Sequence, residues 1–178
     1  MPLQPAVSFL ARKTIRTAYD QLNQIILPRD SCDFKSLTLE YVRNSALAIE
    51  DQLASRRSLR NMRRLLPLFN GLEHYGNVIS VLCNGTPYLS WIWAPIALIL
   101  RISCEYVEAF EQIIKAYSGI AESLQRFEIL NKALRTNSDF QETVAVFYAD
   151  ILLFHEHAYK FVRRNGMFVV FLRDRDKY

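Results

Sequence analysis

The chain contains few of the residues that break helices or form β turns. It has only five glycines and six prolines in 178 residues, and long segments contain neither. Strand hairpins need such residues at their turns, and neither a hairpin signal nor an internal repeat occurs. Hydrophobic residues make up 51% of the chain and charged residues 22%, which excludes a disordered or fibrous protein. The composition therefore favours an all-α fold in one domain large enough to bury a core.

Cysteine is also scarce, with three residues spaced far apart. Cys32, Cys83 and Cys104 are odd in number, which argues against a disulfide framework and for a reduced intracellular setting. The N-terminal sequence MPLQPAVSFLARKTIR lacks the charged region and apolar run of a secretory signal. We therefore expect a cytoplasmic protein, either free or held peripherally at a membrane.

Charged side chains are absent from Tyr75 to Leu100, yet no apolar run there is long enough to span a membrane. A spanning helix needs about twenty consecutive apolar residues. The polar sequence NGTP at 84–87 divides the segment into two shorter runs, which predict two buried helices meeting at a tight turn. Trp91 and Trp93 diverge by about 200° on a helix. Either both pack inside, or one is in the core while the other faces a groove or another domain.

The sequence also lacks motifs that carry chemistry. No glycine-rich phosphate loop is present. His155 and His157 are two residues apart, so on a helix they point to different faces, unlike the i, i+4 histidines of zinc sites. The cysteines have no metal-ligand spacing, and the pair Glu105 and Glu108 lies on a predicted solvated helix face. We therefore predict no catalytic residue, metal, cofactor or small-molecule substrate.

Apolar periodicity divides the chain into helices. We predict helices over about 6–27, 34–55 (capped by Ser31 or Asp33), 67–84, 88–103, 104–124 and 126–134, followed by a long one from Ser138 to Gly166. The segments 88–103 and 104–124 are either separate or continuous, with Pro95 near the start or at a kink. Ser138 and Gln141 have the spacing of a capping box. This gives a single bundle domain of about six to seven helices over 1–165 with a buried central helical hairpin, and a tail over 166–178 whose structure the pattern does not assign.

Two sets of residues stand out from this pattern. The first is a seam along 39–53, spaced 3-4-3-4, which packs internally or against a partner helix: Leu39, Val42, Ala46, Ile49 and Leu53. The second is the set that we predict to form the core hub: Trp91, Trp93, Pro95, Phe110, Tyr117, Phe147 and Phe154. Tyrosine and phenylalanine at helical spacing belong to the core in most proteins.

The net charge of +4 is unevenly distributed, since the first third of the chain is basic, the middle is acidic and the last residues are basic. One helical face gathers five arginines: Arg56, Arg57, Arg60, Arg63 and Arg64. No acidic residue lies between Asp51 and Glu73 to neutralise them. The face either contacts an anionic partner, such as lipid headgroups or an acidic protein, or is solvated and balanced by the acidic middle of the chain. Nucleic acid is the weaker option, because no aromatic residues interleave with the arginines.

The segment 60–165 resembles a helical module at the N-terminus of fungal NACHT-type STAND proteins, the fungal counterparts of NOD-like receptors. The likeness lies in WIWAPIALIL, EAFEQIIKAYSGIAESL and FYADILLFHEHAYKFVRR. The matching positions are Trp93, Pro95, Phe110, Tyr117, Ile120, Phe140, Tyr148, Ile151, Phe154, His155 and Phe161. The chain departs from the family pattern at Ala94, which stands where glycine is expected, at 124–127, which lack a proline, and after Arg164, where a tryptophan-containing continuation is expected.

This resemblance implies a non-enzymatic input or effector domain placed ahead of a nucleotide-binding oligomerisation domain. No such domain is present in the chain, which is therefore a truncated relative, a stand-alone copy or the product of an altered gene model. We expect a signalling domain that binds a protein partner or a second copy of itself, in self/non-self recognition or cell-death signalling. The alternative is a membrane-binding or membrane-perturbing effector that uses the arginine face and the apolar segment 75–100.

Overall fold

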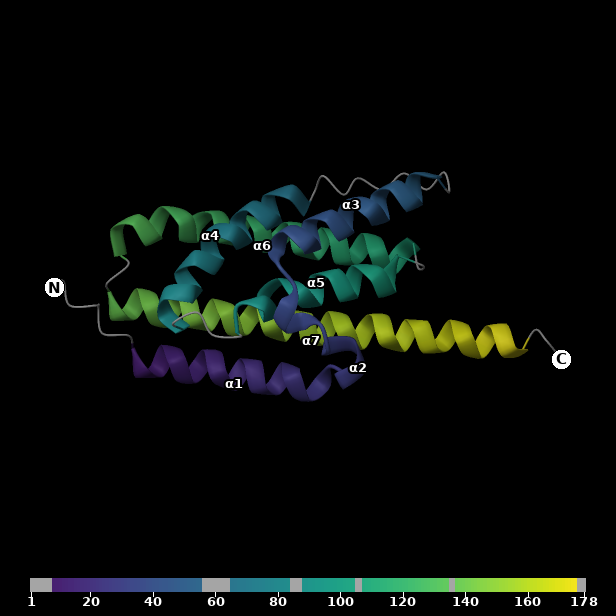
Figure 1. Cartoon of the computed structure of the whole chain (residues 1–178), viewed down its shortest axis with the longest axis horizontal. Helices are drawn as coiled ribbons and strands as arrows, with labels where there is room; N and C mark the ends of the chain where they lie inside the picture. The colour runs from purple at the N-terminus through teal and green to yellow at the C-terminus, as the bar shows by residue number, and fades with distance from the viewer. Residues whose placement is uncertain (1–7, 56–64, 84–87, 105–106, 135–136, 176–178) are drawn as a thin grey trace.

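Helix α5 (Ser90–Ser103) occupies the centre of the structure, a computed structural model that describes residues 8–55, 65–83, 88–104, 107–134 and 137–175 (Figure 1). The other elements are α1 (Phe9–Ile25), α2 (Pro28–Ser31), the 3₁₀ helix η1 (Phe34–Ser36), α3 (Leu39–Ser55), α4 (Leu66–Cys83), α6 (Val107–Leu134) and α7 (Ser138–Arg175). These ranges hold seven α-helices and no strand, which confirms the predicted all-α bundle.

Helix α5 is buried around most of its circumference, as expected of a helix that is apolar on every side. Its main neighbours are α7 and α3, and it also contacts η1, α6 and α4. Helix α4 packs chiefly along α6 and meets α5 where Trp93 lies beside Gly76. The two helices of the predicted central hairpin, α4 and α5, therefore contact each other only slightly. Each packs mainly against other helices, and α5 alone lies at the centre of the bundle.

Helices α1 and α7 lie side by side and run parallel, with the largest helix contact in the structure (Figure 1). At their starts, the Ser8 backbone N–H donates to Gln141 Oε1 at 2.9 Å. At the other end of α1, the Leu27 N–H donates to Tyr159 Oη at 3.3 Å. These contacts at both ends fix the register of the two helices.

The structure corrects two predicted caps. The helix predicted over 34–55 begins only at Leu39, because the Thr38 hydroxyl accepts from the Tyr41 N–H at 3.2 Å. The residues before it form α2, which starts at Pro28, and η1. Ser138 does not cap α7 either: Asn137 Oδ1 accepts from the backbone N–H groups of residues 139 and 140 at 2.8 and 3.1 Å.

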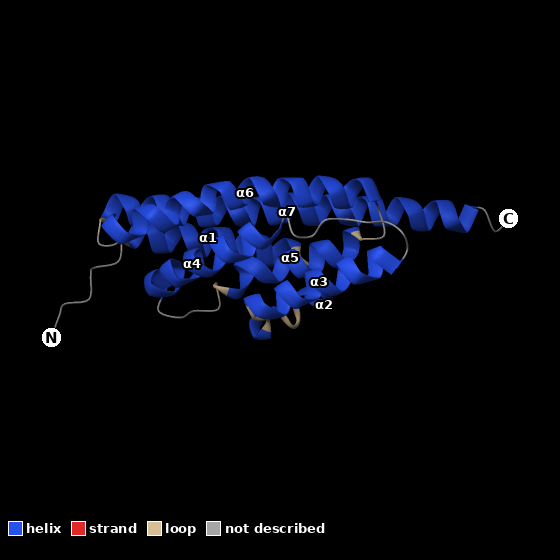
Figure 2. Cartoon of the chain, turned by 90° about the horizontal axis from the view of Figure 1, so that it is seen from above, coloured by secondary structure: helices blue, strands red, loops and turns tan. Residues whose placement is uncertain are grey.

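Two predicted helix ends are also wrong. Helix α6 continues through 125–134, because no proline or glycine interrupts that stretch. Helix α7 continues through Gly166 to Arg175, since one glycine costs a helix only about 1 kcal/mol and no proline follows. The last turns of α7 project beyond the rest of the bundle (Figure 2).

The described residues contain no helix whose length and hydropathy would let it cross a membrane. Much of the described part of the uncharged segment 75–100 is packed inside the protein. Tyr75, Ile79, Ile92 and Leu100 are each at most 1% exposed.

Candidate functional site

The arginine face lies outside the described residues. Arg56, Arg57, Arg60, Arg63 and Arg64 all fall within 56–64, the interval between α3 and α4. Their role as an anionic contact therefore stays a prediction. Leu53, in the predicted seam, likewise has a side chain outside the described set, whereas Val42, Ala46 and Ile49 of that seam are buried against the core.

The residues predicted to form the hub differ in their burial. Trp91, Pro95, Phe110 and Tyr117 are buried, while Trp93, Phe147 and Phe154 are half-buried and pack on the core. The two tryptophans take different roles. Trp91 packs edge-on against Tyr19 and Phe34 with ring centroids 5.2 and 5.0 Å apart, whereas the Trp93 indole N–H donates to the Leu37 carbonyl at 3.0 Å.

His155 is fully buried and joins three helices. Its Nε2 lies 2.8 Å from the Ile92 carbonyl of α5, and its Nδ1 lies 3.2 Å from the Tyr117 hydroxyl of α6. Burial lowers the pKa of His155 to about 4, and the hydrogen bond to Ile92 opposes this only partly. The ring is therefore neutral at pH 7, so Nε2–H donates to the carbonyl and Nδ1 accepts from the tyrosine. A histidine at 0% exposure cannot meet a substrate.

A second polar cluster joins α2 to α7. The Tyr159 hydroxyl donates to Asp30 Oδ2 at 2.6 Å, and Arg163 forms an ion pair with the same oxygen. The Arg163 guanidinium lies 5.4 Å from the Tyr159 ring centroid. Burial acts to raise the pKa of Asp30, but the hydrogen bonds from Tyr159 and Arg163 and the charge of Arg163 lower it overall. The Asp30 carboxylate thus accepts from both Tyr159 and Arg163 and links α2 to α7, while the buried Nε of Arg163 has no hydrogen-bond partner among the described residues.

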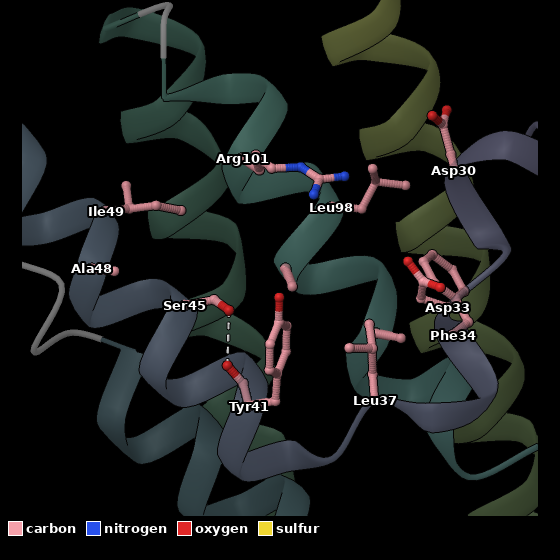
Figure 3. Close-up of a pocket in the computed structure, with 12 residues that line it drawn as sticks. Asp30, Asp33, Phe34, Leu37, Tyr41, Ser45, Ala48, Ile49, Leu98 and Arg101 are labelled. Atoms are coloured by element: carbon pink, nitrogen blue, oxygen red, sulfur yellow. Dashed lines mark hydrogen bonds between the residues drawn. The ribbon is translucent and has the colours of Figure 1, made fainter.

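A groove of about 320 Å³ separates α3 from η1, with α5 as its floor (Figure 3). Tyr41, Arg101 and Asp33 lie around it on three different elements, among small and apolar side chains. Its volume is at the lower end for a ligand pocket. Arg101 and Tyr41 are exposed, so neither is held by surrounding residues as a specific ligand contact would be.

The outward side of α7 carries an exposed strip that the sequence analysis missed. It comprises Asp139, Thr143, Val146, Asp150, Leu153, His157, Lys160, Phe161 and Arg164, and we call it the α7 strip. Val146 is 53% exposed, Leu153 49% and Phe161 38%, at spacings of seven and eight residues. The signal was in the sequence, but the stronger apolar periodicity of the buried face of the same helix concealed it.

No group of three histidine, cysteine, aspartate or glutamate side chains that could hold a metal ion occurs among the described residues. His157 is exposed on the α7 strip and points away from His155, as their spacing predicts. Neither Cys32 nor Cys104 forms a disulfide bond.

Comparison with known proteins identifies a family without a known function. The family model described as "Domain of unknown function (DUF7708)" matches residues 64–171, and the chain belongs to this family. No curated protein matches the chain. No solved structure matches it either.

Proposed function

We propose that this member of the DUF7708 family is a non-enzymatic helical domain that binds a protein partner through the α7 strip. The observation that carries the proposal is the exposure of Val146, Leu153 and Phe161 in one line along α7. Their spacing of seven and eight residues keeps them on one side of the helix over roughly 22 Å. Apolar residues repeated at this spacing are what a second helix needs for side-by-side packing.

The resemblance to the N-terminal module of fungal NACHT-type STAND proteins supports the same role. That resemblance covers 60–165, and the family model covers nearly the same part of the chain, 64–171. In such receptors the module would act as an input or effector domain in self/non-self recognition or cell-death signalling. On our proposal the domain transmits this signal in the cytoplasm by binding its partner through the α7 strip.

The described side chains give less support to the other classes of function. His155 is buried, and the groove beside α3 has exposed polar residues, Tyr41 and Arg101. The membrane-perturbing alternative needs the 75–100 segment to insert, yet Ile92 and Leu98 lie in the core at 0% and 3% exposure. Insertion would require the bundle to open, at the cost of most of its buried apolar contacts.

Site-specific photo-cross-linking tests the proposal. A photoreactive amino acid would replace Leu153 in the full chain, expressed in the cells that normally make it. The control carries the same group at Leu47 of α3, a leucine of similar exposure, 44% against 49%. We expect a discrete protein adduct from position 153 only, and its loss when Val146→Asp is added. Equal adducts from both positions, or none from position 153, would contradict the proposal.

Vesicle flotation tests the membrane alternative. The purified protein would be floated with vesicles of anionic phospholipid at low salt, beside a variant carrying Arg56→Glu, Arg60→Glu and Arg63→Glu. An interaction domain should remain in the unbound fraction. Binding and leakage that disappear in the triple variant would overturn the interaction proposal in favour of a membrane effector.

A further inference from the structure

We propose that the partner of the α7 strip is a second copy of this chain, bound antiparallel about a twofold axis near Leu153. This inference rests on the proposed function, because it names the occupant of the same surface. Charge is distributed unevenly along the strip, and a surface that binds an unrelated partner would not require such an order. Its charged residues are acidic toward the start of α7 (Asp139 and Asp150) and basic toward its end (Lys160 and Arg164), and His157 lies between the two groups.

The order of residues along the strip is self-complementary. In an antiparallel pair whose axis passes between residues 153 and 154, Val146 of one copy lies opposite Phe161 of the other, and Asp150 lies opposite His157. The two copies of Leu153 then lie on either side of the axis, one residue out of register. A twofold interface requires this reciprocity, in which residue i meets j and j meets i. A parallel pair would instead place acidic residues on acidic and basic on basic, which is unfavourable.

The charged members of the strip are available for such contacts. Asp150, His157 and Arg164 are exposed, and no described hydrogen bond or ion pair occupies them. Lys160 is held by Glu156 on the same helix at 2.6 Å, so it contributes less to a partner. Arg163, which does have a firm partner in Asp30, points away from the strip toward α2.

The projecting end of α7 extends the same interface. Residues 166–175 continue the helix past the bundle, and their sequence includes the apolar run MFVVFL (Figure 2). In the antiparallel register this segment passes over the start of α7 in the second copy. There the start of α1 lies alongside, held by the bond from Ser8 to Gln141, and presents Phe9 at 82% and Leu10 at 54% exposure. This contact would cover Phe9 and Leu10.

Sedimentation equilibrium of the purified full chain tests the pairing. We expect a concentration-dependent monomer–dimer equilibrium, because one helix pair with its extension forms an interface of modest area. Leu153→Glu should weaken dimerisation roughly tenfold or more, since two like charges would lie on either side of the axis. The matched control Leu47→Glu on α3 should leave it unchanged. Circular dichroism and thermal unfolding would establish that both variants are folded.

Charge exchange tests the register. Asp150→Lys and His157→Glu should each weaken dimerisation by roughly fivefold, because the twofold axis repeats each pair. The double variant should restore it, since lysine then faces glutamate in the antiparallel pair. If the two copies paired in parallel, the double variant would not restore dimerisation. That result would overturn the antiparallel register.

The outcomes separate this inference from the proposed function. A protein that stays monomeric at several hundred micromolar, or a dimer insensitive to Leu153→Glu, overturns the self-pairing. If the cross-linker at position 153 then captures a different protein, the interaction role stands with another partner. If it captures nothing, both proposals fail.

Discussion

The Nε2 atom of His155 lies 2.8 Å from the backbone carbonyl oxygen of Ile92, linking α7 to the central helix. Ile92 precedes Pro95 by three residues. A proline inside a helix has no N–H to give to the carbonyl four residues earlier, and its ring displaces the preceding turn. The carbonyl that loses its helical donor to Pro95 is that of Trp91, the neighbour of Ile92. The buried histidine adds a donor to the Ile92 carbonyl beside it, and its other nitrogen is satisfied by Tyr117.

Replacing His155 by alanine should destabilise the fold strongly. The substitution leaves a cavity and removes a partner from both the Tyr117 hydroxyl and the Ile92 carbonyl. We expect a loss of roughly 3–5 kcal/mol in the free energy of unfolding. Urea denaturation measures it, with His157→Ala as the control, because His157 is exposed and should change stability by less than about 0.5 kcal/mol. Similar losses in both variants would show that the hydrogen bonds of His155 to Ile92 and Tyr117 do not stabilise the fold.

The same histidine should make stability depend on pH between about 6.5 and 4. In the unfolded chain a histidine binds its proton near pH 6.5, but in the folded protein the pKa of His155 is about 4. Between these values the unfolded state binds more protons, so stability falls as the pH falls. The loss approaches about 3 kcal/mol at pH 4.

Urea titrations at pH 7, 5.5 and 4.5 would measure this dependence in the wild type and in His155→Phe. The difference between the two proteins isolates His155, because the other titrating groups are common to both. This difference in the free energy of unfolding should become smaller as the pH falls. A difference that stays constant over this range would contradict the assignment of a neutral buried ring.

The sequence predicts the architecture well because the signal for a buried helix face is repeated over many turns. The apolar periodicity in 138–162 is one example, because Val144, Tyr148 and Ile151 are buried along one side of α7. Helix ends were predicted less well, since they depend on single side chains: Thr38 and Asn137 cap α3 and α7 in place of the residues expected. The spacing of the α7 strip is present in the sequence, but only burial separates Val146 and Leu153 from the apolar residues of the core, so the periodicity of the buried face concealed it.

Gly71 and Gly119 should respond in opposite ways to alanine. A Cβ atom added to Gly71 would lie 2.7 Å from Cβ of Leu124, so α4 and α6 would have to separate. We expect Gly71→Ala to cost about 1–3 kcal/mol. At Gly119 no atom lies within 4 Å of an added Cβ, and alanine should stabilise α6 by about 0.5–1 kcal/mol. Thermal unfolding of the two variants measures both effects, and a loss at Gly119 equal to that at Gly71 would contradict the close helix approach.

The Asp30 cluster should hold α2 against α7. Asp30→Ala leaves the Tyr159 hydroxyl and the Arg163 guanidinium without their shared acceptor, at a cost of roughly 1–3 kcal/mol. The matched control is Asp20→Ala, which removes an exposed carboxylate 3.9 Å from Arg16 on the same helix and should cost less than about 0.5 kcal/mol. Urea denaturation at pH 7 compares them. If the two losses are equal, the cluster contributes no more than a surface ion pair.

An aspartate at Ile92 tests whether α5 is the centre of the fold or a segment that can leave it. Ile92 is 0% exposed, and a carboxylate there would be buried without a partner. We therefore expect Ile92→Asp to abolish soluble expression, whereas Leu47→Asp, at a site that is 44% exposed, should express normally. Expression yield and circular dichroism measure the result. A folded, soluble Ile92→Asp protein would mean that α5 can leave the bundle, and the membrane-inserting alternative would then become the better account of this segment.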